Sequence, residues 1–178
     1  MDSIVVREET AADVRAIDVV NISAFASENE AKLVSALRQS AGYVPELSLI
    51  AESHNRIVGH ILLTTIGLFN AQGERKILSL APMSVVPSQS HRGIGSALVR
   101  AAIAKAGSLG YPGIVVVGHP EFYKRFAFDS AEKWQIRCPL PVPVDAVTAL
   151  ELTKGGFAGG GALRYPQVML DFYATSGR

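Results

Sequence analysis

Cysteine is nearly absent from this sequence, which holds one, Cys138, among its 178 residues. A single cysteine excludes an internal disulfide, and such scarcity is typical of proteins kept in a reducing compartment. An excess of charge of one sign is lacking as well, because 17 Lys and Arg residues offset 16 Asp and Glu residues to a formal net charge of +1. Charge therefore gives no reason to expect a nucleic acid or an anionic membrane as a partner.

Long apolar runs are also missing, since no stretch approaches the roughly 20 apolar residues that a helix needs to span a bilayer. The first segment, Met1–Glu9, lacks the basic start of a secretory signal and is predicted to form a short strand. We therefore expect a cytoplasmic protein with no membrane partner.

What is present is the composition of a folded globular chain, with 48% hydrophobic and 19% charged residues. The length suits one domain with a proper hydrophobic core. We predict a single domain over residues 1–178, in which residues 130–178 form C-terminal strands and a loop.

Apolar periodicity, capping signals and turn residues predict an α+β layout with one parallel step around a central helix. Helices are predicted over residues 11–24, after a Ser27–Glu30 capping box, over 94–106, and over 120–126. Strands are predicted over residues 4–6, 47–52, 57–68, 76–86, 114–117, 133–138 and 147–152. The Gly-rich segment Gly155–Gly161 is predicted to be a flexible loop with no helix after it.

The most informative segment joins the strand that ends near Val86 to the helix that starts at Ile94. Glycines at positions 93 and 95 allow the backbone to turn tightly and to approach a bulky anion without Cβ clashes. The amides of Gly93, Gly95 and Ser96 lie where a helix presents unpaired N–H groups and the positive end of its dipole. The segment is therefore predicted to bind a pyrophosphate.

Two other nucleotide-binding motifs do not fit this segment. The dinucleotide fingerprint Gly-x-Gly-x-x-Gly fails because Leu98 stands where its third glycine belongs. The nucleoside-triphosphate loop fails because no Gly-Lys-Ser/Thr sequence ends this segment or the Gly155–Gly161 run. A turn that merely joins strand to helix remains an alternative on this motif alone.

Three stretches carry a resemblance to a known family: PELSLIAESHNRIVG over residues 45–59, LAPMSVVPSQSHRGIGSALV over 80–99, and VVVGHPEFYKRFAF over 115–128. In these stretches the sequence resembles a GCN5-related N-acetyltransferase (GNAT), specifically the YhbS-like group of predicted acetyltransferases. The resemblance implies a three-layer α+β fold. Its central sheet would be mixed and mostly antiparallel, with two diverging parallel strands and helices on both faces.

The resemblance also implies acetyl-CoA as cosubstrate and assigns residues to it. The strand residues expected to hold the pantetheine arm by backbone hydrogen bonds are Met83, Ser84 and Val85. The pyrophosphate loop is expected to comprise His91, Arg92, Gly93, Ile94, Gly95 and Ser96. His119 and Tyr123 complete the predicted cofactor site, with Tyr123 as general acid and the Val85 amide as oxyanion donor.

Two positions depart from the family pattern. Ser90 replaces the Gln or Arg that usually stands three residues before Gly93, with Gln89 one position earlier. Because backbone amides provide most of the anion binding, we expect weakened affinity at most. Ala127 replaces the glycine of the more usual Phe-Gly-Phe, which we expect to be a small change.

The predicted reaction moves an acetyl group from acetyl-CoA to an amine of a small molecule or peptide, by direct attack in a ternary complex. Cys138 is expected to be a core or edge residue and not an acyl carrier. Glu30 is the predicted base. Glu28, Glu121, His60, His119 and a bound water are alternatives. No metal is expected, because the four histidines show no ligand spacing.

Other functions remain open at this point. The same fold can serve as a non-catalytic acyl-CoA-binding module or as a transferase of a longer acyl chain. By analogy, the Pro139–Pro143 segment and the Gly155–Gly161 loop border the acceptor side. The sequence does not define the acceptor, and it leaves open whether the protein is a homodimer.

Overall fold

The computed structural model describes residues 3–176, and its strands form one mixed sheet. The strands are β1 (Val5–Glu8), β2 (Tyr43–Ser53), β3 (Arg56–Asn70), β4 (Gly73–Val85), β5 (Gly113–Val117), β6 (Asp129–Ser130), β7 (Ile136–Arg137), β8 (Val147–Glu151) and β9 (Gly161–Arg164). The α-helices are α1 (Val14–Phe25), α2 (Asn29–Arg38), α3 (Ile94–Ser108), α4 (Pro120–Lys124) and α5 (Gln167–Thr175). Short 3-10 turns are η1 (Ala11–Asp13), η2 (Pro87–Gln89), η3 (Ala131–Trp134) and η4 (Val144–Ala146).

The sheet order is β1-β2-β3-β4-β5-β8-β6, and β9 pairs with both β3 and β7. Neighbouring strands β1 and β2 are antiparallel, as are β5 and β8, whereas β4 and β5 are parallel. The β4–β5 step encloses α3, so the predicted parallel step around this helix is confirmed. The parallel ladder pairs residues 78–80 with residues 114–116, although β4 continues to Val85. This early end of the ladder is the divergence that the family resemblance implied.

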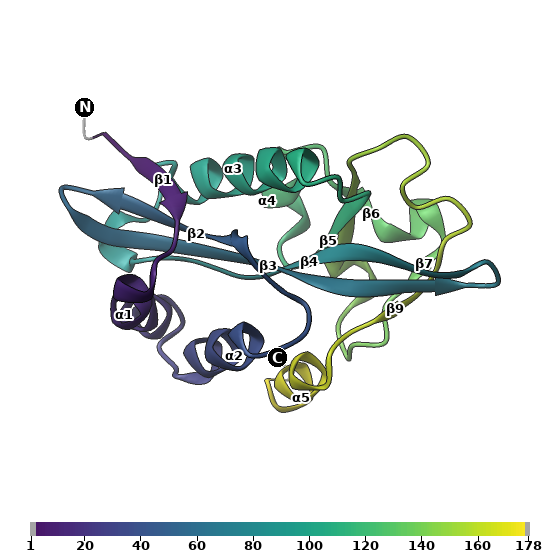
Figure 1. Cartoon of the computed structure of the whole chain (residues 1–178), viewed down its shortest axis with the longest axis horizontal. Coiled ribbons are helices and arrows are strands. Elements are labelled where there is room, and N and C mark those ends of the chain that lie inside the picture. Colours follow the sequence, from purple (N-terminus) through teal and green to yellow (C-terminus); the bar gives the residue numbers. More distant parts are fainter. Residues whose placement is uncertain (1–2, 177–178) are drawn as a thin grey trace. The chain divides into compact units, whose positions relative to one another are not determined.

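The chain divides into two compact units, and β3 and β4 run through both. The first unit comprises the chain up to Leu63 together with Ala81–Ala106. In this unit α1 and α2 lie on one face of the strands and α3 lies on the other (Figure 1). Among residues 3–176, no helix combines the length and the apolar character needed to cross a membrane.

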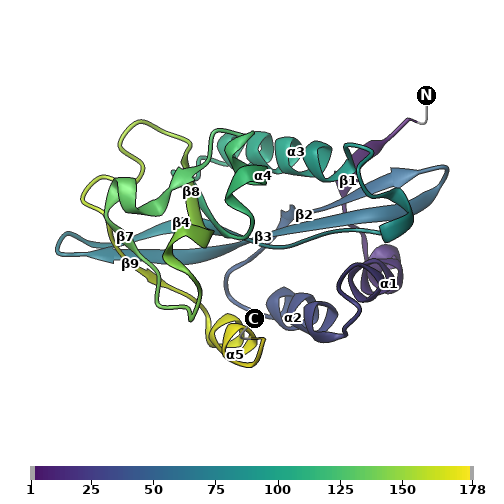
Figure 2. The same cartoon turned by 180° about the vertical axis from the view of Figure 1, so that it is seen from behind.

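The second unit comprises Thr64–Leu80 and the chain from Gly107 onward. Its helices α4 and α5 lie on opposite sides of its strands (Figure 2). Its buried strand β5 contains the β-branched run from Ile114 to Val117, as predicted for a strand covered on both faces. The ends of the predicted domain, Met1, Asp2, Gly177 and Arg178, lie outside the described residues.

The strand predicted over residues 133–138 is wrong in its first half. The chain forms η3 over Ala131–Trp134, and only Ile136 and Arg137 pair as β7. The Ser130 hydroxyl accepts a hydrogen bond from the Glu132 amide at 3.4 Å, which favours a turn at this point. Gln135 then adopts a left-handed conformation with φ 58°, which ends the turn.

The prediction of a flexible Gly155–Gly161 loop with no helix after it is also wrong. The segment is a series of turns, and its Phe157 side chain is 1% exposed against Trp134, with ring centroids 5.3 Å apart. The Arg75 guanidinium donates to the Gly155 and Gly156 carbonyls, and the Glu151 carboxylate accepts from the Phe157 amide at 3.1 Å. These contacts anchor the segment, and β9 and α5 follow it.

Candidate active site

The loop between β4 and α3 has the backbone geometry of an anion-binding site. His91 and Gly93 both have positive φ, at 63° and 80°. The Gly93 carbonyl accepts the first intrahelical bond, from the Ala97 amide at 3.0 Å. The amides of Ile94 and Gly95 therefore precede the first donor of the helix and have no intrahelical acceptor. Turns of this kind direct successive N–H groups toward a shared anion.

Gly93 is required for its backbone conformation, because its φ of 80° is one that other residues rarely adopt. It is not required for space, because no described atom lies within 4 Å of the place where its Cβ would stand. The surface beside it is therefore open, and the positive φ is the constraint. The structure thus places the predicted loop residues in one continuous turn at the positive end of a 15-residue helix.

Gly59 in β3 sets how closely α3 approaches the sheet. A Cβ at this position would lie 2.9 Å from Leu98 Cδ1, 3.1 Å from Ile94 Cγ2 and 3.1 Å from the Ser84 carbonyl oxygen. Only glycine permits the first turn of α3 to pack this closely against β3 and β4. An isolated glycine inside a strand pattern is a known sign of close backbone approach, and this is the signal in the sequence that could have indicated the role of Gly59.

The end of β4 presents alternate residues to different environments. Met83 and Val85 are half-buried, whereas Ser84 between them is 2% exposed and its hydroxyl has no hydrogen-bond partner among residues 3–176. The Val86 amide donates to the Val58 carbonyl of β3 at 2.9 Å. Because successive amides of a strand point to opposite edges, the Val85 amide points away from β3. This is the edge on which the paired β5 ladder has already ended.

Glu30 lies near the start of α2, but the predicted Ser27–Glu30 capping box is wrong. The Ser27 hydroxyl accepts from the Asn29 amide at 3.1 Å, and the helix begins at Asn29, so Glu30 is one position too early for the box. One Glu30 carboxylate oxygen is buried without a hydrogen-bond partner in the described chain. Burial raises the pKa of this carboxyl, while a hydrogen bond from its own backbone amide opposes the shift.

Tyr123 lies in α4 of the second unit and is 7% exposed. The ring packs edge-on against Phe122 and Phe128, with centroids 5.0 and 5.5 Å away. A Cβ on Gly118 would lie 2.9 Å from Tyr123 Cε2, so the ring rests on the glycine that follows β5. Burial, and to a smaller degree Tyr173, raises the pKa of Tyr123 above its ordinary value. Within residues 3–176 no hydrogen bond engages its hydroxyl.

His119 is exposed and precedes α4, where its carbonyl accepts from the Phe122 amide at 3.1 Å. Predicted cofactor residues therefore fall into both units. The end of β4 and the 91–96 loop belong to the first, and His119 and Tyr123 belong to the second.

The other candidates are engaged elsewhere or exposed. His60 is fully buried and hydrogen-bonded to Ser48, at 2.9 Å. Glu28 pairs with Lys32 at 3.2 Å, and Glu121 is an exposed residue in the first turn of α4. Burial raises the pKa of the Cys138 thiol, which disfavours the thiolate that an acyl carrier would need. Residues 3–176 contain no group of three or more His, Cys, Asp or Glu side chains suited to hold a metal ion.

Comparison with known proteins yields close matches. The acetyltransferase (GNAT) family matches residues 15–128. The chain is 31% identical over 134 residues to the protein named uncharacterized N-acetyltransferase YjhQ of Escherichia coli K12, which covers 75% of this chain and 72% of that one. It is 30% identical over 138 residues to the uncharacterized N-acetyltransferase YhbS of the same strain. That alignment covers 76% of this chain and 80% of YhbS.

Solved structures share the fold. The E. coli YhbS structure in complex with CoA superposes with a TM-score of 0.87 at 24% identity, over 95% of this chain and 93% of that one. A GNAT family acetyltransferase from Brucella melitensis in complex with acetyl-CoA gives a TM-score of 0.77 at 25% identity, over 95% and 99%.

Proposed function

Because the chain belongs to the acetyltransferase (GNAT) family, as its motifs predicted, we propose that it moves an acetyl group from acetyl-CoA to an amine. The amine would belong to a small molecule or a peptide. The observation that carries this proposal is the loop before α3, where His91 and Gly93 have positive φ and two helix-start amides have no intrahelical acceptor. Relatives of the same fold have been solved with CoA and with acetyl-CoA.

The residues present fit the cosubstrate. The loop amides and the helix dipole suit a pyrophosphate, and the space around Gly93 is open. The half-buried faces of Met83 and Val85 flank an amide edge of β4 that β3 does not use, which suits backbone hydrogen bonds to a pantetheine arm. Gly59 holds the helix start against this strand.

Acetyl-CoA supplies the thioester whose C–S bond breaks as the C–N bond to the acceptor forms. The attacking amine must be neutral, and Glu30 is the proposed group that accepts its proton. A carboxyl whose pKa is raised by burial is better matched to an amine at neutral pH than a solvated one. The Val85 amide is the proposed donor to the oxyanion of the tetrahedral intermediate.

Tyr123 is the proposed acid for the departing thiolate. Its raised pKa keeps the phenol protonated at neutral pH, and its hydroxyl has no partner in the described chain that would compete for the proton. A phenol with a raised pKa is a weaker acid than a thiol, so proton transfer to the thiolate is uphill, and the tyrosinate that it leaves takes up a proton from solvent to complete the turnover. No covalent enzyme intermediate is required, since both substrates can be held in line.

A thermal-shift titration with CoA tests cosubstrate binding. At 100 times its dissociation constant, a ligand adds about 2.7 kcal/mol of stability, which corresponds to about 5–10 °C for a chain of this size. Gly95→Glu should abolish the shift, because it places a carboxylate against the pyrophosphate. Gly107→Glu is the matched control, since this exposed glycine of the same helix has no atom within 4 Å of its Cβ position.

Unchanged CoA affinity in Gly95→Glu would place the site elsewhere. Release of free thiol from acetyl-CoA in the presence of an amine then separates an enzyme from a non-catalytic acyl-CoA-binding module. A module would show the thermal shift without thiol release.

A further inference from the structure

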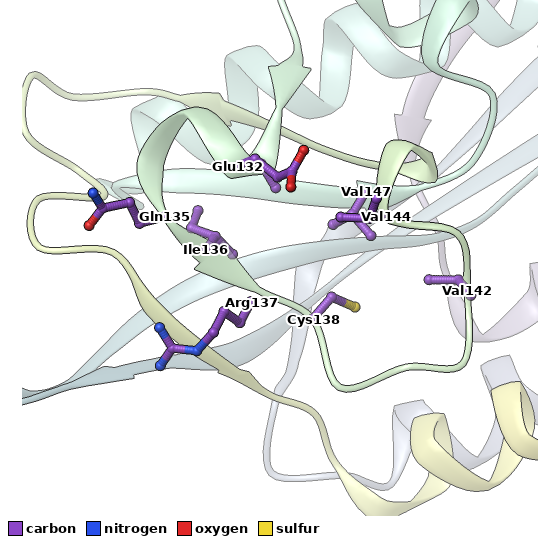
Figure 3. A pocket seen from close by; sticks show the side chains of 9 residues that line it. Glu132, Gln135, Ile136, Arg137, Cys138, Val142, Val144 and Val147 are labelled. Atoms are coloured by element: carbon purple, nitrogen blue, oxygen red, sulfur yellow. The ribbon is translucent and has the colours of Figure 1, made fainter.

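A pocket of about 580 Å³ opens in the second unit, beside the segment that joins β7 to β8 (Figure 3). The residues of its apolar wall are Ala131, Ile136, Cys138, Val142, Val144 and Val147. This volume lies within the roughly 300–1,000 Å³ of small-molecule sites. Val144 is 61% exposed, so the chain leaves an apolar side chain uncovered at the pocket. The wall is therefore suited to an apolar ligand.

Two charged side chains, Glu132 and Arg137, line the pocket. Figure 3 shows Gln135 and Arg137 pointing away from the three valines, whereas the Cys138 sulfur points toward them. The Glu132 carboxylate lies at the edge and has no hydrogen-bond or ion-pair partner within residues 3–176. A second hollow of about 420 Å³ shares Glu132, and its other charged residues are Lys124, Asp129 and Asp145. Because the Arg137 guanidinium points away from the valines, the Glu132 carboxylate is the charge at this edge, and it favours a cation over an anion.

The pocket is joined directly to the segment that carries Tyr123. Val147, in its wall, is paired with Val117, the last residue of β5. The next amide, of Gly118, donates to the Ala146 carbonyl at 3.0 Å, and the Tyr123 ring rests on Gly118. The pocket thus lies at the carboxyl end of β5, which is the end where ligands bind in sheets with parallel strands.

We propose that this pocket holds the acceptor, and that the acceptor is an amine attached to an apolar body without a carboxylate. The apolar body lies against the valines, and the Glu132 carboxylate disfavours an acidic substituent. The inference rests on the proposed acetyl transfer and adds the class of acceptor.

Three probes separate the elements of this proposal. Phenethylamine has the apolar body and a cation, phenylalanine adds a carboxylate to the same body, and ethanolamine lacks the body. With acetyl-CoA at saturation, kcat/KM for phenethylamine should exceed that for each of the other two by at least about tenfold. Equal values for all three would overturn the proposal.

Two variants test the pocket itself. Val144→Trp fills it at an exposed position and should remove the preference for phenethylamine over ethanolamine, whereas Val5→Trp, at a 53% exposed valine of β1, should not. Glu132→Gln should reduce the preference for phenethylamine over phenylalanine, whereas Glu46→Gln, at an exposed glutamate of β2, should leave it unchanged. Wild-type preferences in both pocket variants would place the acceptor elsewhere.

Cys138 provides a readout that does not depend on turnover. It is the only cysteine of the chain, so the mass added by methyl methanethiosulfonate reports this pocket alone. Phenethylamine should slow the labelling, and ethanolamine at the same concentration should not. If the proposed function fails, no amine releases thiol from acetyl-CoA, and labelling still decides whether the pocket takes apolar amines. Thiol release from acetyl-CoA without protection of Cys138 would contradict the proposal that this pocket holds the acceptor. It would still support the proposed acetyl transfer.

Discussion

Tyr123 combines a buried position with a hydroxyl that makes no hydrogen bond within residues 3–176. Phe122, Phe128 and Gly118 hold the ring on three sides, so its position does not depend on the hydroxyl. Burial raises the pKa of Tyr123, so the phenol stays protonated throughout the neutral range. Packing and proton transfer can therefore be separated by removing a single oxygen atom.

We expect Tyr123→Phe to lower kcat far more than it raises the KM for acetyl-CoA. General acid catalysis contributes about 10²–10⁴-fold, and a loss of this size is expected in single-turnover rates at saturating substrate. Tyr111→Phe is the matched control, because Tyr111 hydrogen-bonds Thr65 at 3.2 Å and has no proposed role. Equal rates for Tyr123→Phe and wild type would make Tyr123 a packing residue only.

Ala127 occupies a backbone conformation that favours glycine. Its φ is 68°, and the Phe128 amide donates to the Tyr123 carbonyl across it, at 3.4 Å. This is the left-handed end of a short helix, where glycine usually stands. The alanine, which the sequence predicted to be a small change, therefore stores local strain of about 1–2 kcal/mol.

Ala127→Gly should raise the free energy of unfolding by about 0.5–1 kcal/mol, since relief of strain exceeds the added entropy of the unfolded chain. Urea denaturation measures the change. Ala158→Gly is the control, because exposed Ala158 does not have a positive φ and should lose stability. If Ala127→Gly lowers the free energy of unfolding, the backbone at Ala127 is not strained.

At the scale of elements, the placement of α3 on β3 and β4 decides where the anion-binding loop lies. The contact depends on Gly59, beneath Ile94 and Leu98, with the Ser84 carbonyl on the same side. Because the helix packs so closely on the sheet at this glycine, a methyl group added there would displace the first turn of the helix.

Gly59→Ala should therefore lower both stability, by about 1–3 kcal/mol, and affinity for CoA. Calorimetric titration and urea denaturation measure the two effects. Gly107→Ala, in α3, is the control. Nothing lies within 4 Å of the added methyl group, so this change should be neutral or should stabilise the protein by up to about 1 kcal/mol. If Gly59→Ala binds CoA with wild-type affinity, the geometry of the anion-binding loop does not depend on this packing.

At the scale of the whole molecule, a buried polar network ties the elements of the first unit together. Glu9, after β1, accepts from Arg38 of α2 at 2.8 Å and from Tyr43 of β2 at 3.2 Å. The Ser48 hydroxyl donates to the same carboxylate. Burial alone would raise the pKa of Glu9, but hydrogen bonds from His60, Arg38 and Ser48 outweigh it and hold the pKa well below its ordinary value.

His60 extends this network to β3 and α1. Because the Ser48 hydroxyl donates to Glu9, it accepts from His60 Nε2, at 2.9 Å. His60 Nδ1 then faces the Asn21 amide group at 3.5 Å as an acceptor. The imidazole is thus neutral with its proton on Nε2. Burial lowers its pKa, and Glu9 only partly opposes this shift.

Both groups predict loss of stability in acid. A histidine with a lowered folded pKa binds more protons unfolded, so stability falls as pH drops below about 6.5. The lowered pKa of Glu9 adds a further loss below about 4.5, where the unfolded carboxyl takes up its proton. In urea denaturation between pH 7 and 5, His60→Gln should remove up to about 1.4 kcal/mol per pH unit of the slope. Exposed His54 gives the control, His54→Gln, and an unchanged slope in His60→Gln would contradict a neutral buried imidazole.

The sequence by itself determined the features that depend on neighbouring residues. The glycines at 93 and 95, directly before a helical pattern, indicated the loop, and the β-branched run 114–117 indicated a buried strand. The family motifs then predicted the mixed sheet with its diverging parallel pair, which the fold confirms. These signals are readable because backbone conformation at turns and strands is largely set within a few residues.

Only the tertiary structure decided the features that depend on residues far apart in the chain. Arg75 and Phe157 anchor a Gly-rich segment that by itself indicated a flexible loop, and α5 comes after it in the chain. Burial of Glu30 and Tyr123, and the wall of the Val144 pocket, arise from segments that meet only in the fold. Desolvation and packing are properties of the assembled chain, so no local pattern of residues encodes them.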